Sequence, residues 1–274
     1  MKAIVKVPRC PLRRTPSFRS EVVDEVILGW PVEVLEAADG WVELVTAYRY
    51  RGFAPADCLE LREEQVTSWR AMPQLVFLGA VGDVLSGPRY QSSTLLTLLR
   101  GSLLGVSQSP EEAWRAVALP DGREGFLAAG HSLCPVPPPD TGHPDCFRRT
   151  VCRNALRYLG VPYRWGGKTP LGIDCSGLAF MAYWLSGVAI YRDADLKKGF
   201  PMVEVPQAQL CPADLLYYPG HVALYLGEGQ YIHASGQANG VVIGSLEPGS
   251  ASYRPDLSRE QLLRVGRLDS LPTR

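Results

Sequence analysis

Residues 174–185, which read DCSGLAFMAYWL, predict a buried helix that starts beside a cysteine. Positions 178–185 are all apolar and contain no β-branched residue, and Ser186-Gly187 follows as an end signal. Cys175 then lies in or just before the first turn. There, unpaired backbone N–H groups and the helix dipole favour the thiolate and can hold an oxyanion. The segment therefore predicts Cys175 as a nucleophile.

Two of the four histidines fall on one predicted hairpin. Residues 221–226 and 230–235 have strand character, and the loop 227–229 carries glycine where a positive φ is easiest. If Leu226 faces Gln230, His221 and His233 are diagonal neighbours on the same face of the hairpin. This arrangement makes His221 the candidate base for Cys175 and His233 the residue that orients it.

Several motifs together resemble the NlpC/P60 peptidases, a papain-like α+β family. The resemblance covers roughly residues 146 to 270. It implies that Cys175 attacks, that His221 is general base and acid, that His233 orients His221, and that Tyr163 helps stabilise the oxyanion. Ala213 departs from the family, which often has glycine there. The matching segments are Pro162-Tyr163-Arg164-Trp165-Gly166-Gly167, Asp174-Cys175-Ser176-Gly177-Leu178, Ala213-Asp214-Leu215, Gly220-His221-Val222-Ala223-Leu224-Tyr225 and Tyr231-Ile232-His233-Ala234.

The N-terminal half contains a weak internal repeat. Trp41 precedes Gly52-Phe53 by the same 11 residues that separate Trp114 from Gly125-Phe126. Alternating apolar residues and turn formers predict two all-β barrels of about five strands each, which resemble bacterial SH3 domains. We therefore expect SH3-like domains at 1–62 and 63–135, a proline-rich linker at 136–144 and a catalytic domain at 145–274. This last domain should open with a helix over 148–158 that Gly160 ends.

This domain architecture resembles the endopeptidases that cut the γ-D-glutamyl-L-diamino acid bond of murein peptides with a free N-terminal L-Ala. Residues that bind the substrate and its ammonium are then expected among Asp174, Ser176 and Asp193, with Glu21 and Tyr50 from the first SH3-like domain. Two of these have simpler explanations. Glu21 could be a solvated edge charge, and Asp193 could pair with Arg192.

Composition excludes some functions and leaves others open. Lys plus Arg and Asp plus Glu number 28 each, so no basic field favours nucleic acid or a membrane surface. The seven scattered cysteines lack metal-ligand spacing, so neither metal nor cofactor is expected, and most cysteines should be buried. His131 and His143 are expected at the surface. The N-terminus lacks a signal-peptide pattern, which predicts a cytoplasmic enzyme, and we expect a monomer.

Two alternatives remain at this point. The same Cys-His pair could serve another papain-like amidase or an acyltransferase. A protein of a different class, which binds the cell wall through its SH3-like domains and has an inert third domain, is disfavoured because Cys175, His221 and His233 are all present.

Overall fold

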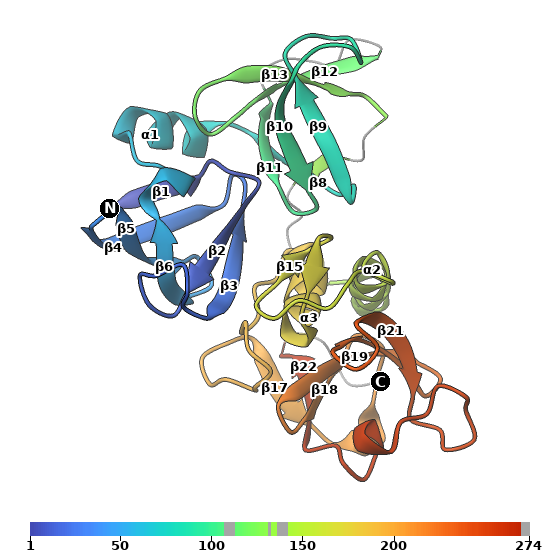
Figure 1. Ribbon diagram of the computed structural model, residues 1–274. Coiled ribbons are helices and arrows are strands. Elements are labelled where there is room, and N and C mark those ends of the chain that lie inside the picture. Colours follow the sequence, from blue (N-terminus) through green and yellow to red (C-terminus); the bar gives the residue numbers. More distant parts are fainter. Residues whose placement is uncertain (107–112, 131–132, 136–141, 270–274) are drawn as a thin grey trace. The chain divides into compact units, whose positions relative to one another are not determined.

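The computed structural model describes residues 1–106, 113–130, 133–135 and 142–269. The chain divides into two compact units, Met1–Val136 and Pro137–Arg274 (Figure 1). Part of the expected linker, residues 136–141, lies outside the described residues, as does His131.

The N-terminal unit holds two all-β modules with the same topology. Their sheets run β3-β2-β6-β5-β4-β1-β7 and β10-β9-β13-β12-β11-β8-β14, so each strand of the first has its counterpart seven strands later. The repeat seen in the sequence is therefore a structural repeat. The strands are β1 (Lys2–Val5), β2 (Arg9–Arg13), β3 (Val22–Ile27), β4 (Pro31–Ala38), β5 (Trp41–Thr46), β6 (Arg51–Pro55), β7 (Leu59–Glu60), β8 (Gln74–Phe77), β9 (Val81–Leu85), β10 (Thr94–Leu99), β11 (Leu103–Val106), β12 (Trp114–Ala118), β13 (Glu124–Ala128) and β14 (Leu133–Pro135).

These modules differ from expectation in two respects. Each described sheet has seven strands rather than about five, because strands as short as β7 and β14 carry no alternation to detect. A helix, α1 (Glu63–Ala71), lies between the modules and was not predicted. The modules contact each other, since Trp30 Nε1 of the first donates to the Gly101 carbonyl of the second at 2.8 Å. Helix α1 is tied to the first module, since Trp69 Nε1 donates to the Gly29 carbonyl at 3.2 Å.

The C-terminal unit is α+β, as predicted. Its main sheet is antiparallel with the order β17-β22-β18-β19-β20-β21, and both α2 and α3 contact β19 (Figure 1). The elements are α2 (Pro144–Leu156), β15 (Lys168–Thr169), β16 (Gly172–Ile173), α3 (Cys175–Trp184), β17 (Met202–Val205), β18 (Leu215–Tyr218), β19 (His221–Gly227), β20 (Gln230–Ser235), β21 (Gly240–Ser245) and β22 (Arg264–Leu268), with short 3-10 turns η2 (Gln207–Gln209) and η3 (Pro255–Leu257).

The two helices explain how the sequence encodes this unit. In α3 every residue except the last is buried, which accounts for a run that is apolar on all sides. Helix α2 begins four residues earlier than expected, because Pro144 sets φ at the first position and leaves no N–H unsatisfied there. At its other end α2 stops at Leu156, two residues before the predicted end, so Gly160, which has φ +79°, lies in the turn beyond the helix and is not the residue that ends it.

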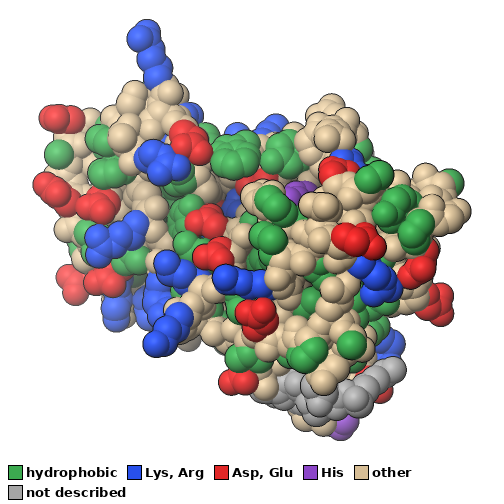
Figure 2. Space-filling view, turned by 90° about the horizontal axis from the view of Figure 1, so that it is seen from below, with side chains coloured by type: hydrophobic (Ala, Val, Ile, Leu, Met, Phe, Trp, Pro, Cys, Tyr) green, Lys and Arg blue, Asp and Glu red, His purple; other side chains and the backbone are tan. Residues whose placement is uncertain are grey.

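The face of the molecule seen in Figure 2 carries no large patch of charged side chains of a single sign. Basic and acidic side chains are interspersed over this face, in keeping with equal numbers of each. Within the described ranges, no helix has the length and apolar character needed to cross a bilayer. The cysteines differ from expectation, because only Cys10, Cys175 and Cys211 are buried, and Cys146 is exposed.

Candidate active site

Cys175 is the first residue of helix α3, where the sequence placed it. Asp174 caps the helix, and its Oδ1 accepts from the Gly177 N–H at 2.6 Å. Cys175 is buried, with 8% of the residue exposed to solvent. Backbone N–H groups of Val222 and Ser176 donate to its sulfur. Donors at this position also suit the oxyanion that forms when the sulfur attacks a carbonyl.

The acidity of Cys175 differs from the expectation of a favoured thiolate. Burial, with a smaller contribution from the nearby Asp174 charge, raises the pKa of its thiol to about 11, although the Val222 N–H and Arg192 act to lower it. Desolvation thus outweighs the backbone N–H donors and Arg192. The resting nucleophile is a thiol, so its base must take the proton as the attack proceeds.

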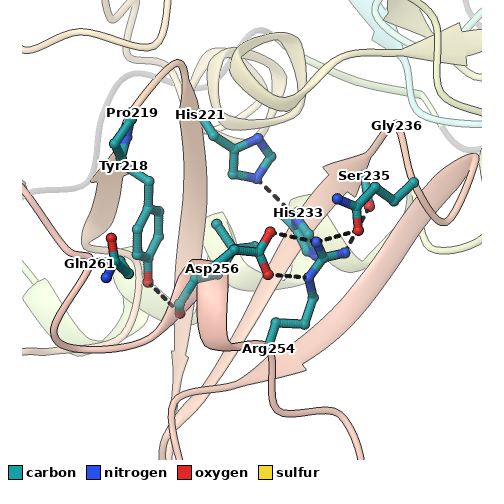
Figure 3. A pocket seen from close by; sticks show the side chains of 11 residues that line it. Tyr218, Pro219, His221, His233, Ser235, Gly236, Arg254, Asp256 and Gln261 are labelled. Carbon is teal, nitrogen blue, oxygen red and sulfur yellow. Dashed lines mark hydrogen bonds and ion pairs between the residues drawn. The ribbon is translucent and has the colours of Figure 1, made fainter.

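His221 and His233 meet directly, as the predicted hairpin required. His221 Nε2 and His233 Nδ1 are 2.9 Å apart, and the two rings are nearly perpendicular (Figure 3). Burial lowers the pKa of His221 to about 4 and that of His233 to about 3. Both imidazoles are therefore neutral at neutral pH, and His221 can accept a proton.

The hairpin register is correct over most of its length and wrong at its tip. Tyr225 pairs with Tyr231 and Leu224 with Ile232, as predicted, but Gly227 rather than Leu226 faces Gln230. A bulge before Gly227 absorbs the extra residue and leaves a two-residue turn with positive φ at Glu228 and Gly229. The bulge restores the predicted register toward the two histidines.

The contact between the histidines fixes their protonation. For His221 Nδ1 to take the thiol proton, Nε2 must carry the hydrogen and donate to His233 Nδ1. His233 then carries its own hydrogen on Nε2, which is buried and has no acceptor among the described residues.

A buried network fixes the segment that carries the nucleophile. Arg192, 1% exposed, donates to both Asp174 oxygens at 3.1 and 3.0 Å and to Ser176 Oγ at 2.7 Å. Asp174 Oδ2 also accepts from the Gly166 N–H at 2.8 Å. The carboxylate expected to bind substrate is thus already neutralised by a guanidinium. The sequence suggested Arg192 only as a partner for Asp193, and the structure shows that it pairs with Asp174.

Tyr163 interacts electrostatically with Cys175, and its role toward the oxyanion stays a prediction. Burial, with smaller contributions from Cys175 and Asp174, raises the pKa of its hydroxyl to about 12, so the phenol keeps its proton. Asp193 is partly buried and accepts from the Tyr191 hydroxyl at 3.1 Å. Ala213 has φ +73°, which gives a physical reason for glycine in relatives at this position.

The other predicted residues, Glu21 and Tyr50, lie far from Cys175 in the sequence. Glu21 Oε2 accepts from Arg14 Nε at 2.7 Å, and the Tyr50 N–H donates to Thr46 Oγ1 at 2.9 Å, both in the N-terminal unit. Their contact with substrate stays a prediction. His143 is exposed, as expected. Among the described residues, no group of three or more His, Cys, Asp or Glu side chains is placed to hold a metal ion.

A pocket of about 550 Å³ borders the two histidines and was missed in the sequence. Its lining includes Arg254 and Asp256, which form an ion pair at 2.6 Å (Figure 3). These residues come from a loop outside every recognised motif. The only signal in the sequence is that Arg254 and Asp256 are two residues apart, a spacing that lets a carboxylate meet a guanidinium across a tight turn.

Comparisons with known proteins agree with this geometry. The NlpC/P60 family model matches residues 160–256, which include Cys175, His221 and His233. Dipeptidyl-peptidase 6 of Lysinibacillus sphaericus is 40% identical over 262 residues, covering 94% of this chain and 96% of that protein. Peptidoglycan endopeptidase RipB of Mycobacterium tuberculosis is 30% identical over 250 residues, covering 80% of this chain and 93% of RipB.

Solved structures give the same fold. The crystal structure of an NlpC/P60 family protein from Bacillus cereus aligns over 99% of this chain and 100% of its own, with a TM-score of 0.81 at 20% identity. The likeness therefore extends to the N-terminal β modules as well as the catalytic unit. With a helix-start thiol, a histidine pair and relatives matched along nearly their whole length, the chain belongs to the NlpC/P60 family of cysteine peptidases.

Proposed function

We propose that this enzyme hydrolyses the γ-D-glutamyl-L-diamino acid bond of murein stem peptides that begin with a free L-Ala. The observation that carries the proposal is an intact Cys175, His221 and His233 constellation in a chain similar throughout to a protein named as a dipeptidyl-peptidase. L-Ala-γ-D-Glu is a dipeptide, so a dipeptidyl-peptidase acting on such a peptide releases it. The similarity to a peptidoglycan endopeptidase supports a substrate derived from the cell wall.

The chemistry follows from the geometry. Cys175 Sγ attacks the γ-carbonyl carbon of D-Glu while His221 Nδ1 takes the thiol proton. Backbone N–H groups at the start of α3 and the Tyr163 hydroxyl stabilise the oxyanion. The C–N bond then breaks, the leaving amine takes the proton from His221, and a thioester remains on Cys175. Water, deprotonated by His221, hydrolyses the thioester and regenerates the thiol.

Recognition of the free N-terminus is assigned to acidic residues other than Asp174. Because Arg192 already neutralises Asp174, we assign the substrate ammonium to Asp193. Asp174 and Ser176 then act on the substrate indirectly, by holding the nucleophile's helix.

We also propose that the enzyme acts in the cytoplasm, as a monomer, on wall fragments that are being recycled. Free cysteines, none of them in a disulfide, suit a reducing compartment. Cell fractionation with an antibody against the native protein tests the location. Recovery chiefly from the medium or envelope would refute it.

The specificity is tested with three substrates of one sequence. The tripeptide L-Ala-γ-D-Glu-diamino acid, its N-acetyl form and intact murein are incubated with the enzyme, and the products are weighed by mass spectrometry. Only the free tripeptide should be cut, because acetylation removes the ammonium that Asp193 binds. Equal rates on the acetylated peptide would exclude recognition of the N-terminus, and Asp193→Asn should reduce kcat/KM for the free form about 10- to 150-fold.

A further inference from the structure

The pocket beside the histidines contains charged groups that the proposed reaction does not use. Its lining includes His221 and His233 at one side and the Arg254–Asp256 ion pair, and it does not include Cys175 (Figure 3). The pocket therefore lies on the imidazole side of the reacting atoms. Its volume of about 550 Å³ is within the range of sites that bind small molecules.

The reaction determines which part of the substrate lies on that side. His221 must give its proton to the leaving amine, so that amine has to be within hydrogen-bond reach of the ring. The D-Glu acyl group stays with the sulfur, whereas the leaving residue lies beyond His221. The pocket is thus placed to hold the diamino acid and, in particular, its side chain.

Arg254 is held rigidly at the pocket wall. Its Nε and Nη2 donate to the two Asp256 oxygens at 3.1 and 2.6 Å, and Nη2 also donates to Gln237 Oε1 at 2.6 Å. Nη1 contacts Ser235 Oγ at 3.4 Å, at the end of the strand that carries His233. Leu257, three residues after Arg254, is buried, and its carbonyl accepts from the Tyr218 hydroxyl at 3.0 Å. The ion pair is therefore preorganised rather than a mobile surface contact.

The ion pair still has capacity for a ligand. The Asp256 side chain is 55% exposed and the Arg254 side chain 24%. A lone ammonium placed here is attracted by Asp256 and repelled by Arg254, so the two effects largely cancel. A group that carries an ammonium and a carboxylate together can place each on its opposite charge. The pair thus discriminates between side-chain ends of different charge.

We infer that Arg254 and Asp256 recognise a leaving diamino acid whose side chain ends in an amino-carboxylate group, and that they disfavour one ending in a bare ammonium. The inference rests on the proposed function. Meso-diaminopimelic acid has such an end and L-lysine does not. The carboxylate binds Arg254 and the ammonium binds Asp256, which makes these residues the determinants of the diamino acid that is accepted.

The test compares two peptides, L-Ala-γ-D-Glu-meso-diaminopimelic acid and L-Ala-γ-D-Glu-L-lysine, with four proteins. These are the wild type, Arg254→Gln, Asp256→Asn and the control Arg259→Gln. Arg259 lies in the same segment but pairs with Glu247 outside the pocket lining. The ratio of kcat/KM for the two peptides is measured, because any general change in the histidines alters both substrates alike and cancels.

We expect the wild type to prefer the diaminopimelic peptide. Arg254→Gln should reduce its kcat/KM about 10- to 100-fold while changing that of the lysine peptide less than about threefold, and Arg259→Gln should preserve the ratio. Amidating the side-chain carboxylate should reproduce the loss in the wild type and have no added effect in Arg254→Gln. Equal wild-type rates on both peptides, or an unchanged ratio in Arg254→Gln, would overturn the inference alone. Cleavage of neither peptide would overturn the proposed function and the inference with it.

Discussion

Removing His233 should slow catalysis without weakening substrate binding. In the tautomer that leaves His221 Nδ1 ready to take the thiol proton, the Nε2–H of His221 donates to His233 Nδ1, 2.9 Å away on the other side of the ring. In His233→Ala the buried N–H of His221 loses its partner, at a cost of about 1–3 kcal/mol. The ring can escape this cost by moving its hydrogen to Nδ1, where it can no longer accept the thiol proton. We therefore expect kcat to fall about 5- to 150-fold with KM nearly unchanged.

A conservative variant separates positioning from simple loss of packing. The amide oxygen of asparagine occupies nearly the place of a histidine Nδ1, so His233→Asn can accept the same hydrogen bond. It should recover kcat to within about 10-fold of the wild type, given that a neutral hydrogen bond is worth about 1 kcal/mol. His143→Ala, which changes an exposed histidine, is the matched control and should have no effect.

The assay is steady-state cleavage of the tripeptide, with thermal unfolding of each variant measured alongside. His233 is 1% exposed, so the alanine variant loses stability, and its activity is compared below its unfolding temperature. A kcat for His233→Ala within twofold of the wild type would refute the role of this contact. An asparagine variant as slow as the alanine variant would likewise show that the acceptor is not what matters.

Three further predictions concern protonation, the buried network and inhibition. Burial lowers the folded pKa values of His221 and His233 to about 4 and about 3, below the ordinary 6.5. The unfolded chain therefore binds protons first, and stability should fall as pH drops from about 6.5 toward 4, measured as the midpoint of thermal unfolding; an unchanged midpoint over that range would contradict the burial. Arg192→Gln should lower the free energy of unfolding by about 3–5 kcal/mol, because it leaves the buried Asp174 charge unpaired. Arg264→Gln, which removes an exposed ion pair with Glu204, should lower it by less than about 1 kcal/mol. Urea unfolding measures both values, and similar losses in the two variants would contradict the stabilising role of the buried network. Iodoacetamide should inactivate the enzyme at a rate that rises with pH toward the Cys175 pKa of about 11, and a rate that levels off near pH 7 would show that this pKa is lower. Chelators should leave the activity unchanged, and inhibition by a chelator that zinc reverses would show that the enzyme needs a metal ion.

Local patterns predicted the nucleophile and the histidine pair because each depends on neighbours in sequence. Cys175 needs only the helix that follows it, and His221 and His233 need only one hairpin, whose register tolerated a bulge at its tip. The seven-stranded modules were underestimated, since two-residue strands such as Leu59–Glu60 form only when long-range partners are present.

The remaining features depend on residues far apart in the chain. The Arg192 contact with Asp174 spans 18 residues, and no pattern in the sequence distinguishes it from a pair with the adjacent Asp193. The direction of the Cys175 pKa shift was predicted wrongly for a similar reason. The N–H groups at the helix start are visible in the sequence, whereas the desolvation that outweighs their effect arises only when the fold closes around the thiol.

The central claim, that Cys175 cuts the bond after D-Glu, is tested most directly by weighing the products that wild type and Cys175→Ala form from L-Ala-γ-D-Glu-meso-diaminopimelic acid. The wild type should release L-Ala-γ-D-Glu and free diaminopimelic acid, and the variant, which lacks the nucleophile, should release neither while unfolding at nearly the same temperature. The same two products from Cys175→Ala, or wild-type fragments from any other bond, would contradict the account.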